Sequence, residues 1–486
     1  MVKRISVVAI LGLFVLGFGA LSSLGAVPNV YAVTSLSTWC SGNGTASSYN
    51  VVTSNCTVTG AAVMSSDVTV SSGETLAISG EGIITISSGV TLTVDSGGTL
   101  TVSNIGTSNY KGIVNSGTFT NSGNITISGG VEYSYGIVNS GTFTNSGNIT
   151  ISNSVMCSSG IRNGGTFTNS GNITISNSAS AYCSGAGIYN AAKFSNDAGG
   201  NITISNSGSG TGVYSIGIYG AGGSVNNSGR LNVENTGTGI GTGSGIDSGI
   251  GIDGCIVNNS GTINVENTGG DGLYASRVYN SGTINVENTG GDGIDSSFLT
   301  NSGTVTISNS GYSIGTYLNE NSVANSGTVT ISNSGYNSYG IEYDAFDGGN
   351  ITNSGTINVE NTGGTGIYVT GSAYYPRIVT NLCSATITIG TSASFDNQGT
   401  VTNSGTITGT ITGNAVVQGA ACATSSTTTT TTSWSTSASS PSTGVPEFPA
   451  LSALTPILLI ALLLPALLIV GRKFRATRSS LYQSAP

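Results

Sequence analysis

The chain has 486 residues, of which 75 are Gly and only 7% are charged, whereas about 25% of residues are charged in an ordinary soluble domain. It contains no His, which excludes the enzymes and metal sites that depend on imidazole as an acid, a base or a ligand. All 21 acidic residues but only half of the 12 basic ones lie between the two apolar ends, so we expect no nucleic-acid partner for this acidic middle.

Residues 1–32 have the composition of a secretory signal peptide. Lys3 and Arg4 precede an apolar run from Val7 to Ala20, and Val30-Tyr31-Ala32 offers a cleavage site of small residues. The alternative is an N-terminal anchor that is not cleaved. Under both interpretations, the residues that follow are expected to be exported.

A repeat fills most of the remaining chain. Near copies at 112–128, 136–152 and 160–176 contain Gly-Ile-x-Asn, Gly-Thr-Phe-Thr-Asn-Ser-Gly and Asn-Ile-Thr-Ile-Ser. Each copy holds three short alternating segments, separated by Asn, Ser and Gly residues that tolerate tight turns and left-handed backbone conformations. The pattern predicts an all-β fold, a parallel β-helix over residues 60–415 with three short strands per coil of 21–24 residues. Residues 33–59 would form an N-terminal cap region.

The alternation also predicts which side chains face the core. Ile125 and Ile127 should lie on one face of their strand and Thr126 on the other. Because coils stack about 4.8 Å apart, like residues should form ladders, with Ile and Val inside and Thr and Asn outside. The Asn-Ser-Gly-Thr pattern resembles the right-handed β-helices of adhesin-like and autotransporter-like surface proteins, an architecture that hosts different activities.

Nine Asn-x-Ser/Thr sequons occur in the chain, and in a sequence this rich in Asn, Ser and Thr many arise by chance. Four of them share one outward ladder position, at Asn124, Asn148, Asn172 and Asn201. We therefore predict glycosylation at these four residues, provided that the host has the machinery.

Seven Cys in an exported chain predict disulfides and one unpaired thiol. Their spacing is not typical of a zinc site. The pairs expected are Cys40–Cys56, Cys157–Cys183 and Cys383–Cys422, with Cys255 left over.

A row of outward residues follows the Gly-Ile element along the coils. It contains Val114, Val138, Arg162, Tyr189, Tyr219, Asp253, Tyr274, Asp295, Tyr317 and Tyr368. Aromatic faces beside hydrogen-bond acceptors hold sugar rings, which makes Tyr189, Tyr219, Tyr274, Tyr317 and Tyr368 candidate carbohydrate-binding residues. The alternative is a structural ladder in which each cross-strand pair stabilises the stack by about 0.2–1 kcal/mol.

Asp271 and Asp292 occupy the same Gly-Gly-Asp-Gly corner in consecutive coils, so their carboxylates should lie about 5 Å apart. They are interpreted as solvated carboxylates, as a Ca²⁺ site or as a catalytic pair. Polysaccharide lyases and hydrolases use parallel β-helices, and retaining glycosidases hold two carboxyl groups about 5–5.5 Å apart. Against catalysis, the chain lacks His, Arg277 is isolated, and the insertions are short and rich in Gly and Ser. No cofactor other than Ca²⁺ is expected.

A third class of function is suggested by Thr304-Val305-Thr306 and Thr328-Val329-Thr330, which resemble the flat Thr arrays of ice-binding solenoids. Neighbouring coils interrupt the array with Asn and Glu. Thr also points outward in any strand of this kind, so the array is weak support for ice binding.

The C-terminal segments predict a membrane anchor. Residues 416–449 form a Ser/Thr-rich stalk that cannot build a core. Residues 450–471 are apolar and uncharged and are long enough to cross a hydrocarbon layer of about 30 Å. The basic residues of segment 472–486 place this tail in the cytoplasm and the β-helix outside.

Pro446, Glu447 and Phe448 stand directly before this apolar segment. The motif, the apolar segment and the basic cluster together resemble the PEF-CTERM sorting signals of archaeal surface proteins. That resemblance implies recognition by an archaeosortase, cleavage near the motif and transfer to a lipid anchor. Residues 476–486 extend further past the basic cluster than is usual for such signals.

The sequence therefore favours a non-enzymatic structural or adhesin-like protein of the cell surface, a single-pass membrane protein with its N-terminal domain outside. Expected partners are the membrane, an archaeosortase, and glycans or neighbouring surface proteins. The alternative is a membrane-anchored polysaccharide lyase or glycosidase of the β-helix type.

Overall fold

The structure, a computed structural model, describes residues 31–33, 51–52, 56–58 and 62–422, with gaps inside the last range. The gaps are 80–82, 104–110, 130–134, 154–158, 178–184, 207–214, 235–249, 255, 276, 288, 297, 309–315, 318–321, 333–339, 344–349, 361–364 and 370–376. The PEF motif, the apolar segment 450–471 and the basic tail lie outside the described residues, as do residues 1–30. Among the residues that are described, no helix is long and apolar enough to cross a membrane.

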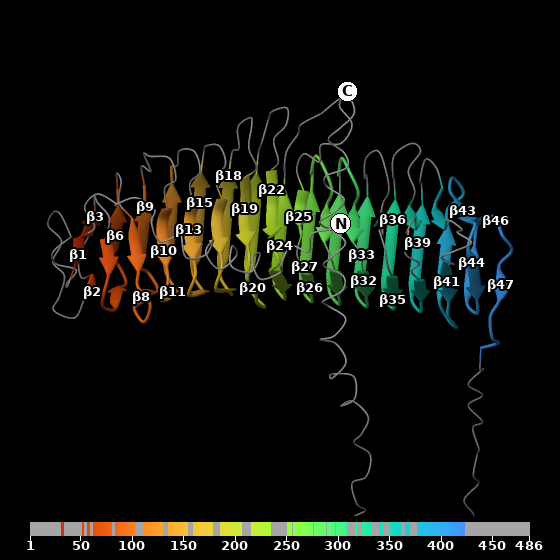
Figure 1. Cartoon of the computed structure of the whole chain (residues 1–486), viewed down its shortest axis with the longest axis horizontal. Helices are drawn as coiled ribbons and strands as arrows, with labels where there is room; N and C mark the ends of the chain where they lie inside the picture. Colours follow the sequence, from red (N-terminus) through yellow and green to blue (C-terminus); the bar gives the residue numbers. More distant parts are fainter. Residues whose placement is uncertain are drawn as a thin grey trace, which may run out of the picture. The chain divides into compact units, whose positions relative to one another are not determined.

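The described strands form three parallel sheets, and every third strand along the chain joins the same sheet (Figure 1). Sheet 1 consists of β1 (Tyr31–Val33), β4 (Ala62–Met64), β7 (Ile84–Ile86), β10 (Lys111–Asn115), β13 (Tyr135–Asn139), β16 (Ser159–Asn163), β19 (Gly185–Asn190), β22 (Ser215–Gly220), β25 (Ile250–Asp253), β28 (Leu273–Ala275), β31 (Ile294–Ser296), β34 (Thr316–Tyr317), β37 (Ile341–Tyr343), β40 (Ile367–Val369), β43 (Ser394–Asn397) and β46 (Thr410–Gly413).

Sheet 2 consists of β2 (Val51–Val52), β5 (Val68–Val70), β8 (Thr91–Val94), β11 (Thr118–Asn121), β14 (Thr142–Asn145), β17 (Thr166–Asn169), β20 (Lys193–Asn196), β23 (Ser224–Asn227), β26 (Ile256–Asn259), β29 (Arg277–Asn280), β32 (Phe298–Asn301), β35 (Ser322–Asn325), β38 (Asn350–Asn353), β41 (Ile378–Asn381), β44 (Thr400–Asn403) and β47 (Val417–Gln418).

Sheet 3 consists of β3 (Cys56–Val58), β6 (Thr75–Ile78), β9 (Thr99–Val102), β12 (Asn124–Ser128), β15 (Asn148–Asn153), β18 (Asn172–Asn177), β21 (Asn201–Asn206), β24 (Arg230–Glu234), β27 (Thr262–Glu266), β30 (Thr283–Glu287), β33 (Thr304–Ser308), β36 (Thr328–Ser332), β39 (Thr356–Glu360), β42 (Thr386–Ile389) and β45 (Thr406–Thr408). One strand from each sheet makes one coil, which confirms the predicted parallel β-helix with three strands per coil.

The coils extend beyond the expected range of 60–415 at both ends. β1 begins at Tyr31, inside the expected cleavage site, and β47 ends at Gln418. Coil length varies mainly at the corner between sheet 3 and sheet 1. β12 ends at Ser128 and β13 begins at Tyr135, whereas β24 ends at Glu234 and β25 begins only at Ile250. Insertions at this corner leave the register of the sheets unchanged.

The core is built from ladders of like apolar residues, as the alternation predicts. Ile125 and Ile127 are buried, while Thr126 between them is exposed. Sheet 2 contributes a buried column of aromatic rings at Phe119, Phe143, Phe167 and Phe194. Successive ring centroids in this column lie 4.5, 4.6 and 5.0 Å apart. Burial of each such side chain stabilises the fold by about 1.5–3 kcal/mol.

The expectation that Asn faces outward is wrong for the Asn that ends each sheet 2 strand from β11 to β44. These residues form one buried ladder, in which each side-chain Nδ2 donates to the Oδ1 of the next Asn at 2.7–2.8 Å. The ladder, called the asparagine ladder below, consists of Asn121, Asn145, Asn169, Asn196, Asn227, Asn259, Asn280, Asn301, Asn325, Asn353, Asn381 and Asn403.

The ladder satisfies the buried amides inside a narrow core. Asn259 donates to the Oδ1 of Asn280 at 2.8 Å and to the backbone oxygen of Thr283 at 2.9 Å, and its own Oδ1 accepts from Asn227. Such pairing removes the cost of burying polar groups. A shorter ladder of the same type ends the strands of sheet 1 and contains Asn115, Asn139, Asn163 and Asn190.

Close backbone contact between coils explains the Gly of the Asn-Ser-Gly motif. A Cβ atom at Gly147 would meet the backbone oxygen of Gly123, and one at Gly171 would meet that of Gly147. These glycines are not left-handed, because positive φ in the described part of the chain occurs at other glycines, such as Gly73 and Gly97. Close packing between coils, and not a left-handed backbone, therefore requires the Gly here.

The predicted disulfide between Cys383 and Cys422 is confirmed, with the two Cα atoms 5.5 Å apart. It links the corner after β41 to the residues that follow β47. Cys56 is also disulfide-bonded. Cys40, Cys157, Cys183 and Cys255 lie outside the described residues, so their pairing stays a prediction.

The asparagine ladder predicts a large loss of stability in Asn169→Ala. The change leaves the Nδ2 of Asn145 and the Oδ1 of Asn196 without their side-chain partners, at a cost of about 1–3 kcal/mol for each buried group. The matched control is Asn172→Ala, which removes an exposed Asn from the same coil and should change stability by less than about 0.5 kcal/mol. Urea unfolding measures both, and equal losses would contradict a stabilising role of the ladder.

Candidate binding surfaces

The outward row on sheet 1 forms one in-register ladder, as the sequence predicts. Strand pairing runs from Val114 through Val138, Arg162, Tyr189, Tyr219, Asp253, Tyr274, Asp295 and Tyr317 to Glu342, Tyr368 and Asp396. We did not expect Glu342 from the sequence, although Gly340-Ile341 directly before it is the same signal. This set is called the tyrosine row below.

The N-terminal part of the tyrosine row is held by contacts among its own side chains and with Tyr135 at the start of β13. The Arg162 guanidinium lies 5.5 Å from the ring centroids of both Tyr135 and Tyr189. The rings of Tyr189 and Tyr219 are 5.3 Å apart and tilted by 52°. These contacts support the structural interpretation of the ladder in this part.

The centre of the row is more open. Tyr274 is 47% exposed, and its strand neighbours on the two adjacent coils are Asp253 and Asp295. Tyr368 is half-buried, and the side chain of Tyr317 lies outside the described set. Tyr274 with its two acidic neighbours therefore has the arrangement best suited to ligand contact, an aromatic face between hydrogen-bond acceptors.

Asp271 and Asp292 lie on successive coils, as expected, but Asp271 is not a solvated carboxylate. It is only 9% exposed, and its Oδ1 accepts a 2.7 Å hydrogen bond from the backbone N–H of Asp292. The carbonyl of Asp292 in turn accepts from the N–H of Gly272 at 2.8 Å. The Asp271 carboxylate thus stabilises the corner between sheet 3 and sheet 1.

Metal binding at this corner stays a prediction. Within the described ranges, no group of three or more His, Cys, Asp or Glu side chains is placed to hold a metal ion. Asp271 and Asp292 would have to bind Ca²⁺ with backbone oxygens or water. The interpretation of the pair as catalytic carboxylates stays a prediction as well.

The four sequon residues share one position on sheet 3, as expected. Asn124, Asn148, Asn172 and Asn201 are paired in register. The first three are exposed, and they form a surface ladder in which Asn148 donates to Asn124 at 2.9 Å and Asn172 donates to Asn148 at 3.0 Å. Asn201 is less exposed. Their glycosylation stays a prediction.

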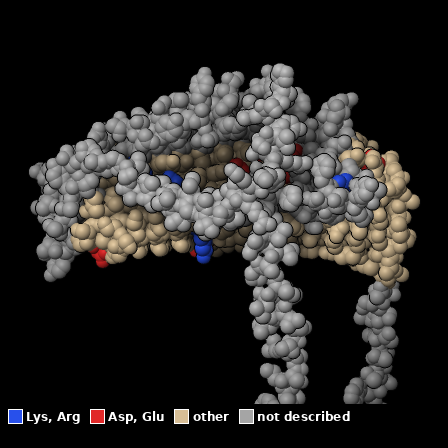
Figure 2. Space-filling model, viewed as in Figure 1, with Lys and Arg blue, Asp and Glu red and all other residues tan. Residues whose placement is uncertain are grey.

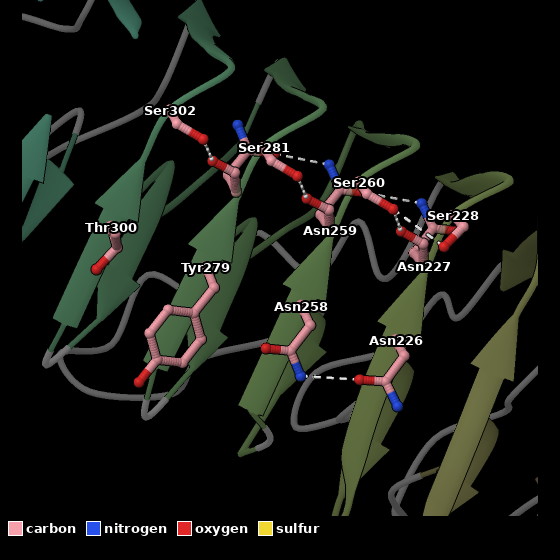
Figure 3. A pocket seen from close by; sticks show the side chains of 11 residues that line it. Asn226, Asn227, Ser228, Asn258, Asn259, Ser260, Tyr279, Ser281, Thr300 and Ser302 are labelled. Atoms are coloured by element: carbon pink, nitrogen blue, oxygen red, sulfur yellow. Dashed lines mark hydrogen bonds between the residues drawn. The ribbon is translucent and has the colours of Figure 1, made fainter. Parts of the chain in front are cut away.

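Sheet 2 carries an open groove that we did not expect from the sequence (Figure 3). Its volume is about 290 Å³. The groove, called the Tyr279 groove below, is lined by Asn226, Asn227, Ser228, Asn258, Asn259, Ser260, Tyr279, Asn280, Ser281, Thr300 and Ser302. One signal in the sequence marks it, because Arg277-Val278-Tyr279-Asn280 replaces the common Thr-Phe-Thr-Asn strand.

The coils around the Tyr279 groove depart from the Thr, Ser and Asn surface of the rest of sheet 2. Tyr279 is 40% exposed, and Ile256 on the preceding coil is 37% exposed. The Arg277 guanidinium lies 5.0 Å from the ring centroid of Phe298. Figure 2 shows few charged side chains on the visible face of the described residues.

Comparison with known proteins adds no relative to these observations. No protein-family model, no curated protein and no solved structure matches the chain.

The corner geometry predicts that Asp271→Ala destabilises the protein. Loss of a hydrogen bond to a charged acceptor lowers the free energy of unfolding by about 1.5–3 kcal/mol. Glu266→Ala is the control, because Glu266 is an exposed carboxylate at the end of β27 and should change stability by less than about 0.5 kcal/mol. Thermal or urea unfolding of the two variants tests the difference. Equal stability of both variants and the unaltered protein would show that the Asp271 bond contributes nothing.

Proposed function

We propose that this protein is a non-enzymatic scaffold of the cell surface that binds carbohydrate along sheet 1. The observation that carries the proposal is the tyrosine row, in which Tyr274 stands exposed between Asp253 and Asp295. Sugar rings stack on aromatic faces and donate hydroxyl protons to carboxylates. One side-chain position is repeated on every coil, which suits a long polymer better than a single small molecule.

The described ladders support a scaffold role. Each coil contacts mainly its neighbours, and stability accumulates along the stack. Buried apolar columns and the asparagine ladder run through most of the coils. A stack of this kind is stiff and repeats each outward position at the coil spacing. That property suits an envelope or matrix component more than a catalyst that encloses its substrate.

Display at the cell surface is supported by the two ends of the sequence. Residues 1–32 have the composition of a signal peptide, and residues 450–471 form an uncharged apolar segment before a basic tail. Pro446, Glu447 and Phe448 add the resemblance to a sorting signal. In this proposal an archaeosortase processes the C-terminal end, and the β-helix faces outward among glycans and neighbouring surface proteins.

Tyr274→Ala should weaken glycan binding by about 30-fold, because a central aromatic contact is worth about 2 kcal/mol. Tyr274→Phe keeps the ring face and should retain most of the affinity. Tyr219→Ala should lower stability more than affinity, since its ring contacts Tyr189. Titration with the glycans selected on an array measures each effect, with Tyr317→Ala tested alongside.

Unchanged affinity in Tyr274→Ala and Tyr317→Ala would refute the sheet 1 site. Polysaccharide cleavage that disappears in Asp271→Asn and Asp292→Asn would favour the lyase or glycosidase alternative instead.

Deletion of residues 445–486 should release the protein from the cell into the medium, because the proposed sorting motif, apolar segment and basic tail are all removed. Deletion of residues 479–486 is the control, because it leaves the basic cluster and the apolar segment in place. Fractionation of cells and medium with an antibody to the β-helix measures the distribution. A protein that stays cell-bound after the larger deletion would contradict C-terminal anchoring.

A further inference from the structure

We propose that the Tyr279 groove is a second carbohydrate site, which binds a neutral glycan chain lying along the axis of the β-helix. The groove is on sheet 2, so it is separate from the tyrosine row on sheet 1. The groove proposal rests on the proposed function in one respect only, namely that the β-helix encounters glycans. Its lining consists of Asn, Ser and Thr side chains around one Tyr, and none of these groups carries a charge at neutral pH.

The floor of the groove offers both a donor and an acceptor on neighbouring coils. Nδ2 of Asn258 donates to Oδ1 of Asn226 at 2.8 Å (Figure 3). The pair keeps Oδ1 of Asn258 as an acceptor and the Nδ2 group of Asn226 as a donor. Amides in this arrangement match adjacent sugar hydroxyls, which donate and accept in the same way.

The serines of the Asn-Ser-Gly turns line the other side of the groove. The hydroxyl of Ser281 donates to the backbone oxygen of Asn259 at 3.3 Å, and that of Ser302 donates to the oxygen of Asn280 at 3.4 Å. Because these hydroxyl protons are donated to backbone oxygens of the protein, the lone pairs of the hydroxyl oxygens can accept hydrogen bonds from a ligand. The serine side therefore presents one acceptor on each coil.

Tyr279 supplies the apolar surface that a sugar ring needs. It occupies the outward position of β29 between Asn258 and Thr300 in the strand register, and it is 40% exposed. In Figure 3 the ring lies beside the amide of Asn258 on the open side of the strands. One aromatic ring among neutral donors and acceptors is a combination that binds the C–H face and the hydroxyls of a pyranose together.

The repeat distance of the groove suits a polymer. Coils are about 4.8 Å apart, so the lining from β23 to β32 spans about 14 Å along the axis. The advance of one pyranose unit in an extended chain is close to one coil spacing. A chain lying along the axis thus meets one outward ladder position at each sugar, occupied in turn by Asn226, Asn258, Tyr279 and Thr300.

The groove is also rigid before any ligand arrives. Asn227, Asn259 and Asn280 of the asparagine ladder form its inner wall and are joined by 2.8 Å hydrogen bonds. Side chains that are already ordered lose little entropy on binding. A preformed site therefore lowers the entropic cost of binding a glycan.

The test uses the full chain in detergent, produced in a bacterial host without N-glycosylation. Its probes are neutral oligosaccharides of glucose, mannose and galactose, with polygalacturonate as the acidic comparison. Tyr279→Ala should lower the affinity for the neutral probe that binds best by at least about tenfold, whereas Tyr279→Phe and the sheet 1 variant Tyr274→Ala should retain it. Binding should change little between low and high salt, since the lining is uncharged. Thermal unfolding identifies any variant that has lost its fold.

Unchanged affinity in Tyr279→Ala, or binding of the acidic probe alone, would overturn the groove proposal and leave the sheet 1 proposal standing. Loss of neutral-probe binding in Tyr279→Ala together with full binding in Tyr274→Ala and Tyr317→Ala would support the groove, while the sheet 1 site is tested separately with the glycans selected on the array. Absence of binding to every probe would refute the groove proposal. A glycan covalently attached to Asn226 or Asn258 in material from the native host would also overturn the proposal, because it would fill the groove.

Discussion

The hydrogen bond between the side chains of stacked asparagines is the constraint on which the rest of this structure depends. Each buried amide has to pair both as donor and as acceptor. Asn259 accepts from the equivalent Asn227 on the preceding coil and donates to the equivalent Asn280 on the next coil. A slip of one residue would bury the outward face and expose the core. The ladder therefore sets the register of sheet 2 from β11 to β44, and closure of each coil carries that register to the other two sheets.

Because the strands are in register, one outward strand position on successive coils forms a continuous row along the sheet. The tyrosine row exists because Tyr219, Asp253 and Tyr274 occupy the same place on successive coils. The Tyr279 groove follows from the same geometry on another sheet, where Asn226 and Asn258 stand beside Tyr279. Differences in coil length lie mainly at the corner between sheet 3 and sheet 1. Coils of different length therefore keep their strand residues in register.

The two candidate surfaces differ in charge, and this difference suggests different ligands. Tyr274 lies between two aspartates on sheet 1, whereas the lining of the Tyr279 groove is neutral. Carboxylates repel acidic sugars and favour ligands that carry hydroxyl or amine donors. Binding to neutral amides and hydroxyls, by contrast, depends little on salt concentration. A stiff scaffold with two such faces would contact more than one polymer at a cell boundary.

The sequence by itself determined the fold class, because alternation such as Ile125-Thr126-Ile127 is local and repeats with the coil. It also determined the order of the tyrosine row apart from Glu342 and Asp396. The pair Cys383–Cys422 was one of several pairings that the seven Cys allow, and the structure decided it. Only the tertiary structure decided that the strand-end Asn is buried, since an amide faces inward only when an identical amide stacks on it. The burial of Asp271 and the groove at Tyr279 likewise depend on which groups meet across coils, and a linear pattern does not contain those contacts.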